Sequence, residues 1–347
     1  MNMIKNEELY DRKIYYPSNN PKISIIIPVY NGEAFIKETI LSIQNQDFKD
    51  IEIIIVDDQS TDNSVNLIKE LTKTEPRIYL YQNEENKGIL NTKIRGISLA
   101  KGKYIMLIDD DDKYLQRKAF TTLYTEIEKN NLDILGFKTI LSTSFSDMAE
   151  YNTSQKFETP IIFQNELKNL INSWEFFGLK EKNNIQKVNH LIKTDLFQKI
   201  IKQIDDKYSD FKINYFDDYL LFFLLTRNAK SFKQIDNIFY MKEKIIFTDI
   251  PKVNYRKKEK LKNGFNLSCF AYLNIIEILY DKTNNTKEDK KIPFNLFDKL
   301  ILKNQCKNNM KIREQALKIC ELFLNNEYIS SKDKEKIKIF FKQINYF

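Results

Sequence analysis

The chain is poor in glycine, proline, cysteine and histidine, and it has no long apolar run. Its 347 residues include seven Gly, seven Pro, three Cys and one His. The three cysteines have no metal-ligand spacing and form no even set, which indicates a reducing compartment and excludes a disulfide-built fold. No apolar run approaches the roughly 20 residues of a membrane helix, and residues 1–13 lack the apolar centre of a signal peptide. We therefore expect a soluble, cytoplasmic protein.

Glycine-rich phosphate cradles are absent as well. No Gly-x-Gly-x-x-Gly follows the first predicted strand, and no Gly-x-x-x-x-Gly-Lys-Ser/Thr occurs anywhere. These loops are the usual backbone cradles for dinucleotides and for ATP phosphates. A ligand phosphate would therefore have to be neutralised by a cation instead of by a helix N-terminus.

Positive charge gathers at the C-terminal end. Residues 251–347 hold 21 Lys and Arg against 11 Asp and Glu, whereas residues 1–250 carry −3 of the chain's net +7. A basic helical region can contact anionic lipid, here the inner membrane face, or nucleic acid. The solvated faces of ordinary helices have the same composition, and we favour that interpretation; peripheral membrane contact stays open, and no nucleic-acid partner is expected.

The apolar pattern of residues 21–115 alternates between strands and helices. β-branched or apolar runs predict strands at residues 23–29, 51–56, 77–81 and 104–108, and helical spacing predicts helices at residues 34–46, 65–71 and 90–100. This alternation is typical of an α/β fold, a Rossmann-like, mostly parallel sheet flanked by helices.

Polar groups end three of these strands. They are Tyr30-Asn31, Asp57-Asp58 and the run Asp109 to Asp112. The carboxyl ends of parallel strands lie along one edge of the sheet, where open α/β sheets bind ligands. Four adjacent carboxylates repel one another, so they indicate a hard divalent cation that carries phosphate oxygens. The alternative is a solvated acidic turn, but three polar strand ends together favour a nucleotide site.

The same stretches resemble family 2 glycosyltransferases. The resemblance rests on residues 24–31, 55–64, 86–88, 100–105 and 109–112, in order and at family spacing. It implies a glycosyltransferase A-type fold, a nucleotide-diphosphate sugar donor and inversion of the anomeric centre. It also implies a Mn²⁺ or Mg²⁺ cofactor bound directly by Asp111, with Asp109 beside it. The donor-binding residues that it implies are Pro28, Val29, Tyr30, Asn31, Asp58, Gly88, Lys93, Asp109 and Asp110.

Two positions depart from the family pattern. Gln59 stands where the family often has glycine, at a loop position. Lys93 stands where the family commonly has an arginine, and we expect it near the diphosphate, with Arg95 as the less favoured substitute. Lysine is a point charge without the fork of a guanidinium, so it neutralises phosphate with less geometric control.

The second half of the predicted domain contains two adjacent acids at the head of an apolar helix. Asp217 and Asp218 could be ordinary first-turn acids, which the helix dipole favours. By resemblance to the family, Asp218 is instead the general base and Asp217 its supporting neighbour. Around them we expect a helix at residues 115–130, a strand at 132–139 and a closing strand at 235–242. Trp174 is assigned to the core before any sugar-stacking role. His190 stands in a segment, 189–197, that is similar to one the family places beside the acceptor cleft; a structural role is favoured for it, and contact of either residue with the acceptor stays open.

The predicted organisation is an N-terminal lead (1–20), a catalytic domain (21–245) and a basic helical region (246–347). The domain divides into a nucleotide-binding half, 21–115, and an acceptor half, 116–245. Helices are expected at residues 267–280, 294–303, 312–324 and 332–341. The predicted function is a metal-dependent, inverting transfer of sugar, from a UDP-sugar, to a glycan or lipid-linked acceptor. The alternatives are a catalytically silent sugar-nucleotide-binding scaffold and a sugar-phosphate nucleotidyltransferase.

Overall fold

A computed structural model describes residues 19–142, 160–163, 189–204, 213, 217–243, 276–278 and 310–345. The chain forms two compact units. The first consists of residues 1–87, 92–201 and 224–246, and the second of residues 88–91, 202–223 and 247–347. The predictions for Trp174, the loop at 142–159 and the helix at 294–303 fall outside the described residues, apart from Ser142, which ends a strand.

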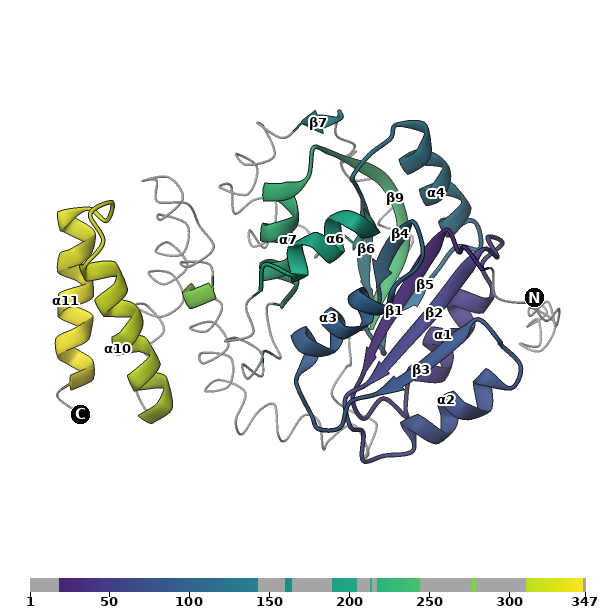
Figure 1. The fold of residues 1–347 in the computed structure, drawn as a ribbon, viewed down its shortest axis with the longest axis horizontal. Coiled ribbons are helices and arrows are strands. Elements are labelled where there is room, and N and C mark those ends of the chain that lie inside the picture. The colour runs from purple at the N-terminus through teal and green to yellow at the C-terminus, as the bar shows by residue number, and fades with distance from the viewer. Residues whose placement is uncertain are drawn as a thin grey trace. The chain divides into compact units, whose positions relative to one another are not determined.

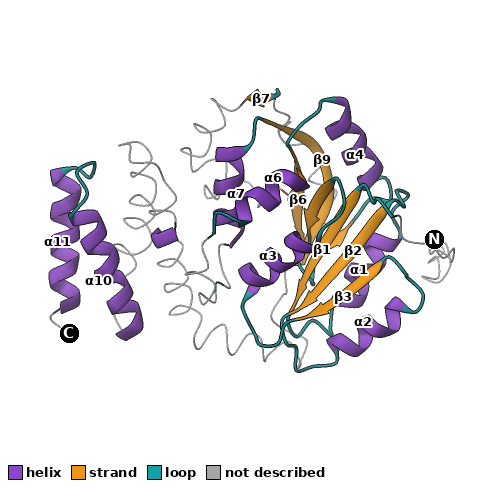
Figure 2. Ribbon diagram, viewed as in Figure 1, coloured by secondary structure: helices purple, strands orange, loops and turns teal. Residues whose placement is uncertain are grey.

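A mixed sheet organises the first unit (Figures 1 and 2). Its strand order is β3-β2-β1-β4-β8-β6-β9-β5, with β7 paired to β9. The strands are β1 (Ile23–Val29), β2 (Ile51–Asp57), β3 (Ile78–Gln82), β4 (Tyr104–Leu107), β5 (Lys113–Tyr114), β6 (Ile134–Ser142), β7 (Ile162–Phe163), β8 (Asn189–Lys193) and β9 (Ser231–Glu243). β1 pairs in parallel with β2 and β4, and β2 in parallel with β3. The predicted α/β class is therefore confirmed.

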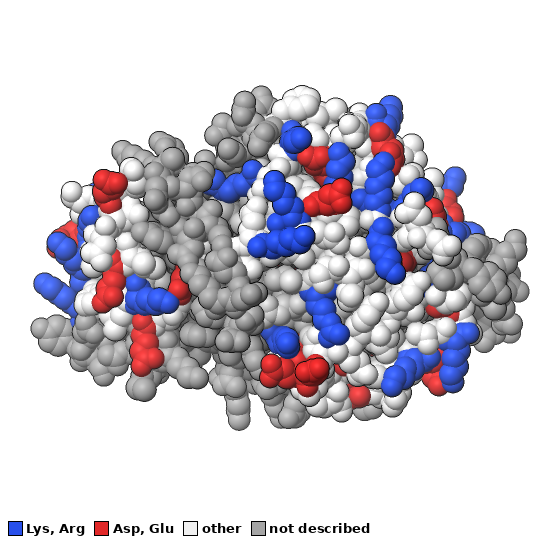
Figure 3. Space-filling view, in the orientation of Figure 1, with Lys and Arg blue, Asp and Glu red and all other residues white. Residues whose placement is uncertain are grey.

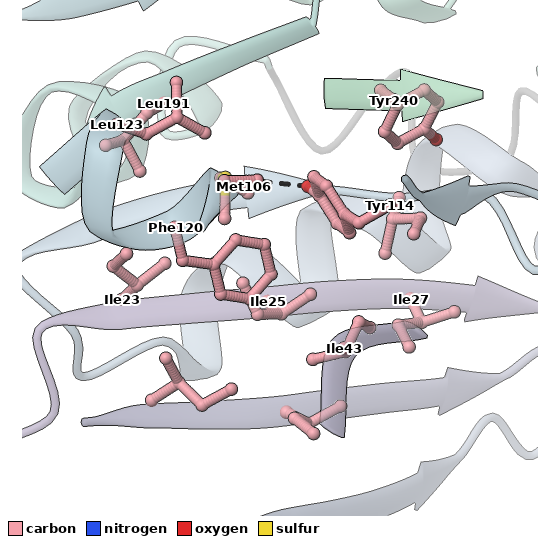
Figure 4. Close-up of a cluster of buried hydrophobic side chains, with 14 of the residues drawn as sticks. Ile23, Ile25, Ile27, Ile43, Met106, Tyr114, Phe120, Leu123, Leu191 and Tyr240 are labelled. Atoms are coloured by element: carbon pink, nitrogen blue, oxygen red, sulfur yellow. Dashed lines mark hydrogen bonds between the residues drawn. The ribbon is translucent and has the colours of Figure 1, made fainter. Parts of the chain in front are cut away.

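Helices cover both faces of the parallel half. They are α1 (Ile36–Gln44), α2 (Ser64–Thr72), α3 (Ile89–Leu99), α4 (Ala119–Lys129) and α6 (Thr194–Ile201). The odd-numbered residues of β1 belong to one core cluster with residues of α1, α2 and α4 (Figure 4). Ile26 points to the opposite face, where a Cβ on Gly96 of α3 would overlap its side chain. Burial on both faces explains why β1 is an uninterrupted apolar run.

The helix predicted at residues 115–130 begins only at Ala119. The preceding residues belong to the sheet edge, because β5 pairs with β9 and the Leu115 N–H donates to the Phe239 carbonyl at 2.9 Å. β5 has only two residues, too few for a periodic signal. Its pairing places the acidic run in a short loop between two strands of one sheet.

Gly102 closes a buried hydrogen-bond cluster at the amino ends of the strands. Its N–H donates to Ser24 Oγ at 2.8 Å and to Glu52 Oε1 at 3.1 Å, and Ser24 Oγ also donates to Glu52 at 2.6 Å. A Cβ on Gly102 would lie 2.6 Å from the Ser24 nitrogen and 2.8 Å from the Ile23 carbonyl carbon. These are backbone atoms, so rotation of a side chain cannot relieve the overlap.

Replacing Gly102 with alanine is therefore expected to destabilise the first unit by about 3 kcal/mol, through overpacking and the loss of buried hydrogen bonds. Urea unfolding measures the change. Ser98→Ala, at an exposed site on α3, is the control and should change stability by less than about 0.5 kcal/mol. Equal stability of the two variants would show that the backbone at Gly102 does not lie this close to the backbone of Ile23 and Ser24.

The second unit contains a helical hairpin of α10 (Met310–Leu324) and α11 (Ser331–Asn345). Both agree with the helices predicted at 312–324 and 332–341. Glu277, within a short helical segment, accepts hydrogen bonds from Gln315 and Lys318 of α10. Positive and negative side chains are interspersed on the visible face of the hairpin (Figure 3). None of the helices in the described part of the chain has the length and apolar content to span a membrane.

Candidate active site

The loops after β1 and β2 are joined by hydrogen bonds through Asn31. Asn31 has a positive φ of 54° and donates its backbone N–H to Ser60 Oγ at 2.9 Å. Its side-chain Oδ1 accepts the Thr61 N–H at 2.8 Å. The left-handed conformation, which asparagine tolerates better than most residues, turns the chain here. Asn31 thus holds two strand ends together at the predicted donor edge.

The three residues before Asn31 differ in exposure. Pro28 and Val29 are buried within β1, whereas the Tyr30 side chain is 42% exposed at the end of the strand. An exposed aromatic ring at a strand end can stack on a planar ligand. Gly88, the one glycine of the predicted donor set, has a positive φ of 82° that suits its turn. The donor-binding roles of these residues stay predictions.

Asp58 is a buried, hydrogen-bonded acid at this edge. Only 3% of it is exposed, and its Oδ1 accepts hydrogen bonds from Asn83 Nδ2 at 2.7 Å and from the Lys87 N–H at 2.8 Å. Its own N–H donates to the Val29 carbonyl at 2.7 Å, which ties it to β1. Asp58 is therefore a fixed hydrogen-bond acceptor at the edge of the sheet.

The acidic run brings three carboxylates together. One oxygen each from Asp109, Asp111 and Asp112 lies within 4.8 Å of the other two. Oxygens bound at about 2.1 Å to one Mg²⁺ lie at most about 4.2 Å apart, so a small closure would let the three share an ion. Carboxylate oxygens are also the ligands that Mg²⁺ and Mn²⁺ prefer. The residues present thus fit a divalent cation, and Asp112 joins the predicted pair of Asp109 and Asp111.

Asp110 points elsewhere. Its backbone carbonyl accepts a hydrogen bond from Thr39 Oγ1 of α1 at 2.9 Å, and its side chain is buried. The carboxylate lies so close to Gly32 that a Cβ there would overlap Asp110 Oδ2. Asp110 therefore fixes the acidic loop against α1, and its predicted role near the donor ribose stays a prediction.

Tyr240 connects the acidic loop to the hydrophobic core. Its hydroxyl donates to Asp112 Oδ2 at 2.6 Å and accepts the Asp109 N–H at 3.3 Å. Its ring packs edge-on against Tyr114, with centroids 5.4 Å apart (Figure 4). Burial, followed by the negative charges of Asp112 and Asp109, raises the pKa of Tyr240 well above its ordinary value. The hydroxyl is therefore protonated at neutral pH and can donate to Asp112.

Replacing Tyr240 with phenylalanine should make the acidic loop less ordered, while the ring still fills its place in the core. Removing the hydroxyl takes a donor from the buried Asp112, at a cost of about 2 kcal/mol, and it frees the loop that would bind the cation. We expect lower stability in urea together with weaker Mn²⁺ binding in calorimetry. Tyr79→Phe, in β3, is the control, because the Tyr79 hydroxyl has no hydrogen-bond partner among the described residues. If both variants bind Mn²⁺ as the wild type does, Tyr240 does not order this loop.

Lys93 is almost completely buried. It is 2% exposed, and its Nζ lies 3.4 Å from Asp109 Oδ1, whose side chain is 25% exposed. A buried ammonium group requires a partner, and Asp109 is one. The sequence did not predict this ion pair. The structure places the Lys93 charge beneath the acidic loop, and its contact with a diphosphate stays a prediction.

The remaining predicted residues lie on α7 (Asp217–Asn228) and β8. Asp217 is buried and Asp218 half-buried, both in the first turn of α7. Their catalytic roles stay predictions. His190 is half-buried in β8 opposite Gly136, with its ring 6.3 Å from that of Phe232. The role of His190 stays a prediction.

Two residues of the site were not anticipated. Asn83 directly follows β3, so the rule that found the other three polar strand ends also applies to it. Tyr240 is 128 residues from Asp112 in the sequence, and no local pattern marks it. Only the antiparallel pairing of β5 with β9 brings it to the acids.

Part of the chain is similar in sequence to known glycosyltransferases. Residues 24–187 match the sequence profile "Glycosyl transferase family 2". A Campylobacter jejuni protein named GalNAc(5)-diNAcBac-PP-undecaprenol beta-1,3-glucosyltransferase is 37% identical over 117 residues, which are 33% of this chain and 38% of that protein. Bacillus subtilis GgaB, a minor teichoic acid biosynthesis protein, is 31% identical over 152 residues, 43% of this chain and 17% of its own. The chain thus matches well under half the length of these relatives.

A solved structure extends the similarity over the fold. The crystal structure of S. aureus TarS 1-349 superposes with a TM-score of 0.59 at 16% identity, covering 94% of this chain and 91% of that one. The sheet and its flanking helices define an α/β protein with the glycosyltransferase A type of fold. Within that class, the segment of residues 24–187, which begins in β1, is similar to glycosyl transferase family 2.

Proposed function

We propose that the protein is a metal-dependent, inverting glycosyltransferase that moves a sugar from a UDP-sugar to a hydroxyl of a glycan or lipid-linked acceptor. The observation that carries the proposal is the carboxylate cluster of Asp109, Asp111 and Asp112 at the same sheet edge as Asp58. The cluster of Asp109, Asp111 and Asp112 suits a cation that carries a diphosphate. The single buried acid, Asp58, suits a hydrogen bond to the base or ribose of a nucleotide.

The names of similar proteins support the donor and acceptor classes. S. aureus TarS has been crystallised in complex with UDP and with UDP-GlcNAc, and the second complex superposes with a TM-score of 0.55 at 14% identity. The Campylobacter relative is named for a saccharide linked to undecaprenol by a diphosphate, and GgaB for teichoic acid biosynthesis. These names favour a UDP-sugar donor and a cell-envelope type of glycan or lipid-linked acceptor.

The proposed chemistry assigns distinct tasks to the acids. Asp109 and Asp111 would hold the divalent cation, which, when bound, neutralises the diphosphate and stabilises charge on the leaving group. Asp218 would accept the proton of the acceptor hydroxyl as its oxygen bonds to the anomeric carbon. The bond from that carbon to the diphosphate breaks on the opposite face, so the configuration inverts. Holding both substrates in line lowers the entropic part of the barrier.

A thermal-shift panel tests the proposal. We would compare UDP-Glc, UDP-GlcNAc, UDP-GalNAc, GDP-Man and UTP, each with and without Mn²⁺. A donor at about 100 times its Kd stabilises the fold by about 2.7 kcal/mol, so one UDP-sugar should raise Tm only when Mn²⁺ is present. The absence of any shift would contradict the proposal. A shift without donor hydrolysis or transfer would favour the silent scaffold, and a shift with UTP and a sugar phosphate would favour the nucleotidyltransferase.

A further inference from the structure

Gly32 lies where the acidic loop, residues 109–112, meets the start of α1. Its carbonyl accepts the Phe35 N–H at 3.0 Å, in the turn that leads into the helix. A Cβ on Gly32 would overlap Asp110 Oδ2, and it would lie 3.2 Å from Asp110 Cγ and 3.2 Å from Val29 Cγ1. The Asp110 carboxylate therefore occupies the space that a side chain at position 32 would fill.

The backbone conformation of Gly32 does not itself require glycine. The φ of Gly32 lies outside the left-handed region, whereas Gly88 has a φ of 82°. An L side chain would fit the backbone at position 32, and it is the contact with Asp110 that excludes one. Asp110 is only 8% exposed, so its carboxylate can move aside only if the packed residues around it move as well.

Hydrogen bonds to α1 hold the acidic loop on both sides of residues 111–112. Thr39 Oγ1 donates to the Asp110 carbonyl at 2.9 Å. The Tyr114 N–H donates to Ser42 Oγ at 3.1 Å. Both partners on the helix side belong to α1, so the position of this helix determines where the acids of the loop lie.

Gly32 also contacts the loop after β2. Its N–H donates to Ser64 Oγ at 2.8 Å. The next N–H, that of Glu33, donates to Asp62 Oδ2 at 3.0 Å. Gly32 therefore has the acidic loop on one side and the loop after β2 on the other, and the spacing of the two loops is set at this residue.

We propose that Gly32 is a positioning residue: the absence of its side chain lets Asp110 dock against the start of α1 and so sets where the candidate metal ligands lie. This inference rests on the proposed function, since it takes the acidic loop as the cation site. Oxygens of Asp109, Asp111 and Asp112 lie within 4.8 Å of one another and must approach to at most about 4.2 Å around one Mg²⁺. A displacement of the loop at Asp110 opposes that closure.

Calorimetry of Mn²⁺ binding to the full chain, alone and with UDP, tests the inference. Gly32→Ala should weaken Mn²⁺ binding about 10-fold, as expected for a residue that orients metal ligands without touching the ion. Gly102→Ala is the matched control, because it adds the same atom in a tight contact at the amino ends of the strands, at the opposite edge of the sheet. It should lower Tm and leave the Mn²⁺ affinity within about twofold of the wild type.

A double-mutant cycle tests whether Gly32→Ala acts through Asp110. Asp110→Ala removes the carboxylate that the new Cβ would overlap, and by itself it should weaken Mn²⁺ binding because the loop loses a buried contact. In that background Gly32→Ala should cost less than about twofold more, because the overlap is gone. A further loss of about 10-fold in the double variant would show that the two positions act independently, which overturns the inference.

Thr39→Val keeps the inference testable if Gly32→Ala does not fold. It removes the donor to the Asp110 carbonyl, adds no overlapping atom and should weaken Mn²⁺ binding about fivefold. Wild-type Mn²⁺ affinity in Gly32→Ala or in Thr39→Val overturns the inference and leaves the proposed function standing, as does an equal loss in Gly32→Ala and Gly102→Ala. If the wild type binds no Mn²⁺, with or without UDP, both are wrong.

Discussion

Replacing Asp111 with asparagine should abolish Mn²⁺-dependent binding of UDP while the fold stays intact. The change removes a charged ligand from a cluster whose oxygens lie within 4.8 Å of one another. A hard cation binds carboxylate far more strongly than a neutral amide, so the remaining acids should hold Mn²⁺ poorly. We expect UDP affinity in the presence of Mn²⁺ to fall at least about 100-fold, and sugar transfer to fall with it.

The matched control for this prediction is Glu85→Gln. It also removes one negative charge, from an exposed residue in the loop after β3 that makes no interaction with another described residue. Calorimetry of UDP with and without Mn²⁺ compares the two variants. Glu85→Gln should behave as the wild type does. An equal loss of UDP affinity in both variants would indicate that removing any nearby negative charge weakens binding. Unchanged Mn²⁺-dependent binding of UDP in Asp111→Asn would show that Asp111 is not a metal ligand.

Replacing Asp218 with asparagine should have the largest effect on the rate of transfer. Asparagine has nearly the same shape but cannot accept the acceptor's proton, and general-base catalysis contributes about 10² to 10⁴ in rate. We expect kcat to fall by about 10³ while UDP affinity stays within about twofold of the wild type. A lower kcat with unchanged UDP affinity indicates that the substitution removes an interaction made only in the transition state.

An exposed acid on α6 controls for the helix-dipole alternative. Asp195 and Asp218 both lie in the first turn of a helix. If Asp218 serves only the dipole, Asp195→Asn and Asp218→Asn should each cost well under about 1 kcal/mol of stability and leave kcat unchanged. Wild-type hydrolysis and transfer in Asp218→Asn would show that another group takes the proton.

The first half of the fold could be predicted because its signals are local. β1 and β2 are buried on both faces, so they appear as continuous runs such as Ile23–Val29, and the acids that follow them mark the sheet edge. Asp58 and the acids at 109–112 do follow their strands at that edge. Asn83 could have been found by the same rule, but a single polar residue after a half-buried strand gives a weak signal.

The second half depends on pairings between distant segments. β8 runs antiparallel between β4 and β6, and β5 is a two-residue strand whose partner is more than 120 residues away. The burial of Lys93 beside Asp109 follows from the position of α3 over the sheet, which a helical pattern does not specify. The contact of Tyr240 with Asp112 follows instead from the pairing of β5 with β9. Local periodicity carries no information about such contacts.

The most direct test is a crystal structure of the full chain with Mn²⁺ and UDP, with data collected to show the anomalous signal of manganese. The signal should lie between the carboxylates of Asp109 and Asp111, with the ion contacting both phosphates of UDP and the base beside Asp58. A diphosphate bound without manganese, or manganese bound away from these acids, would contradict the proposed site.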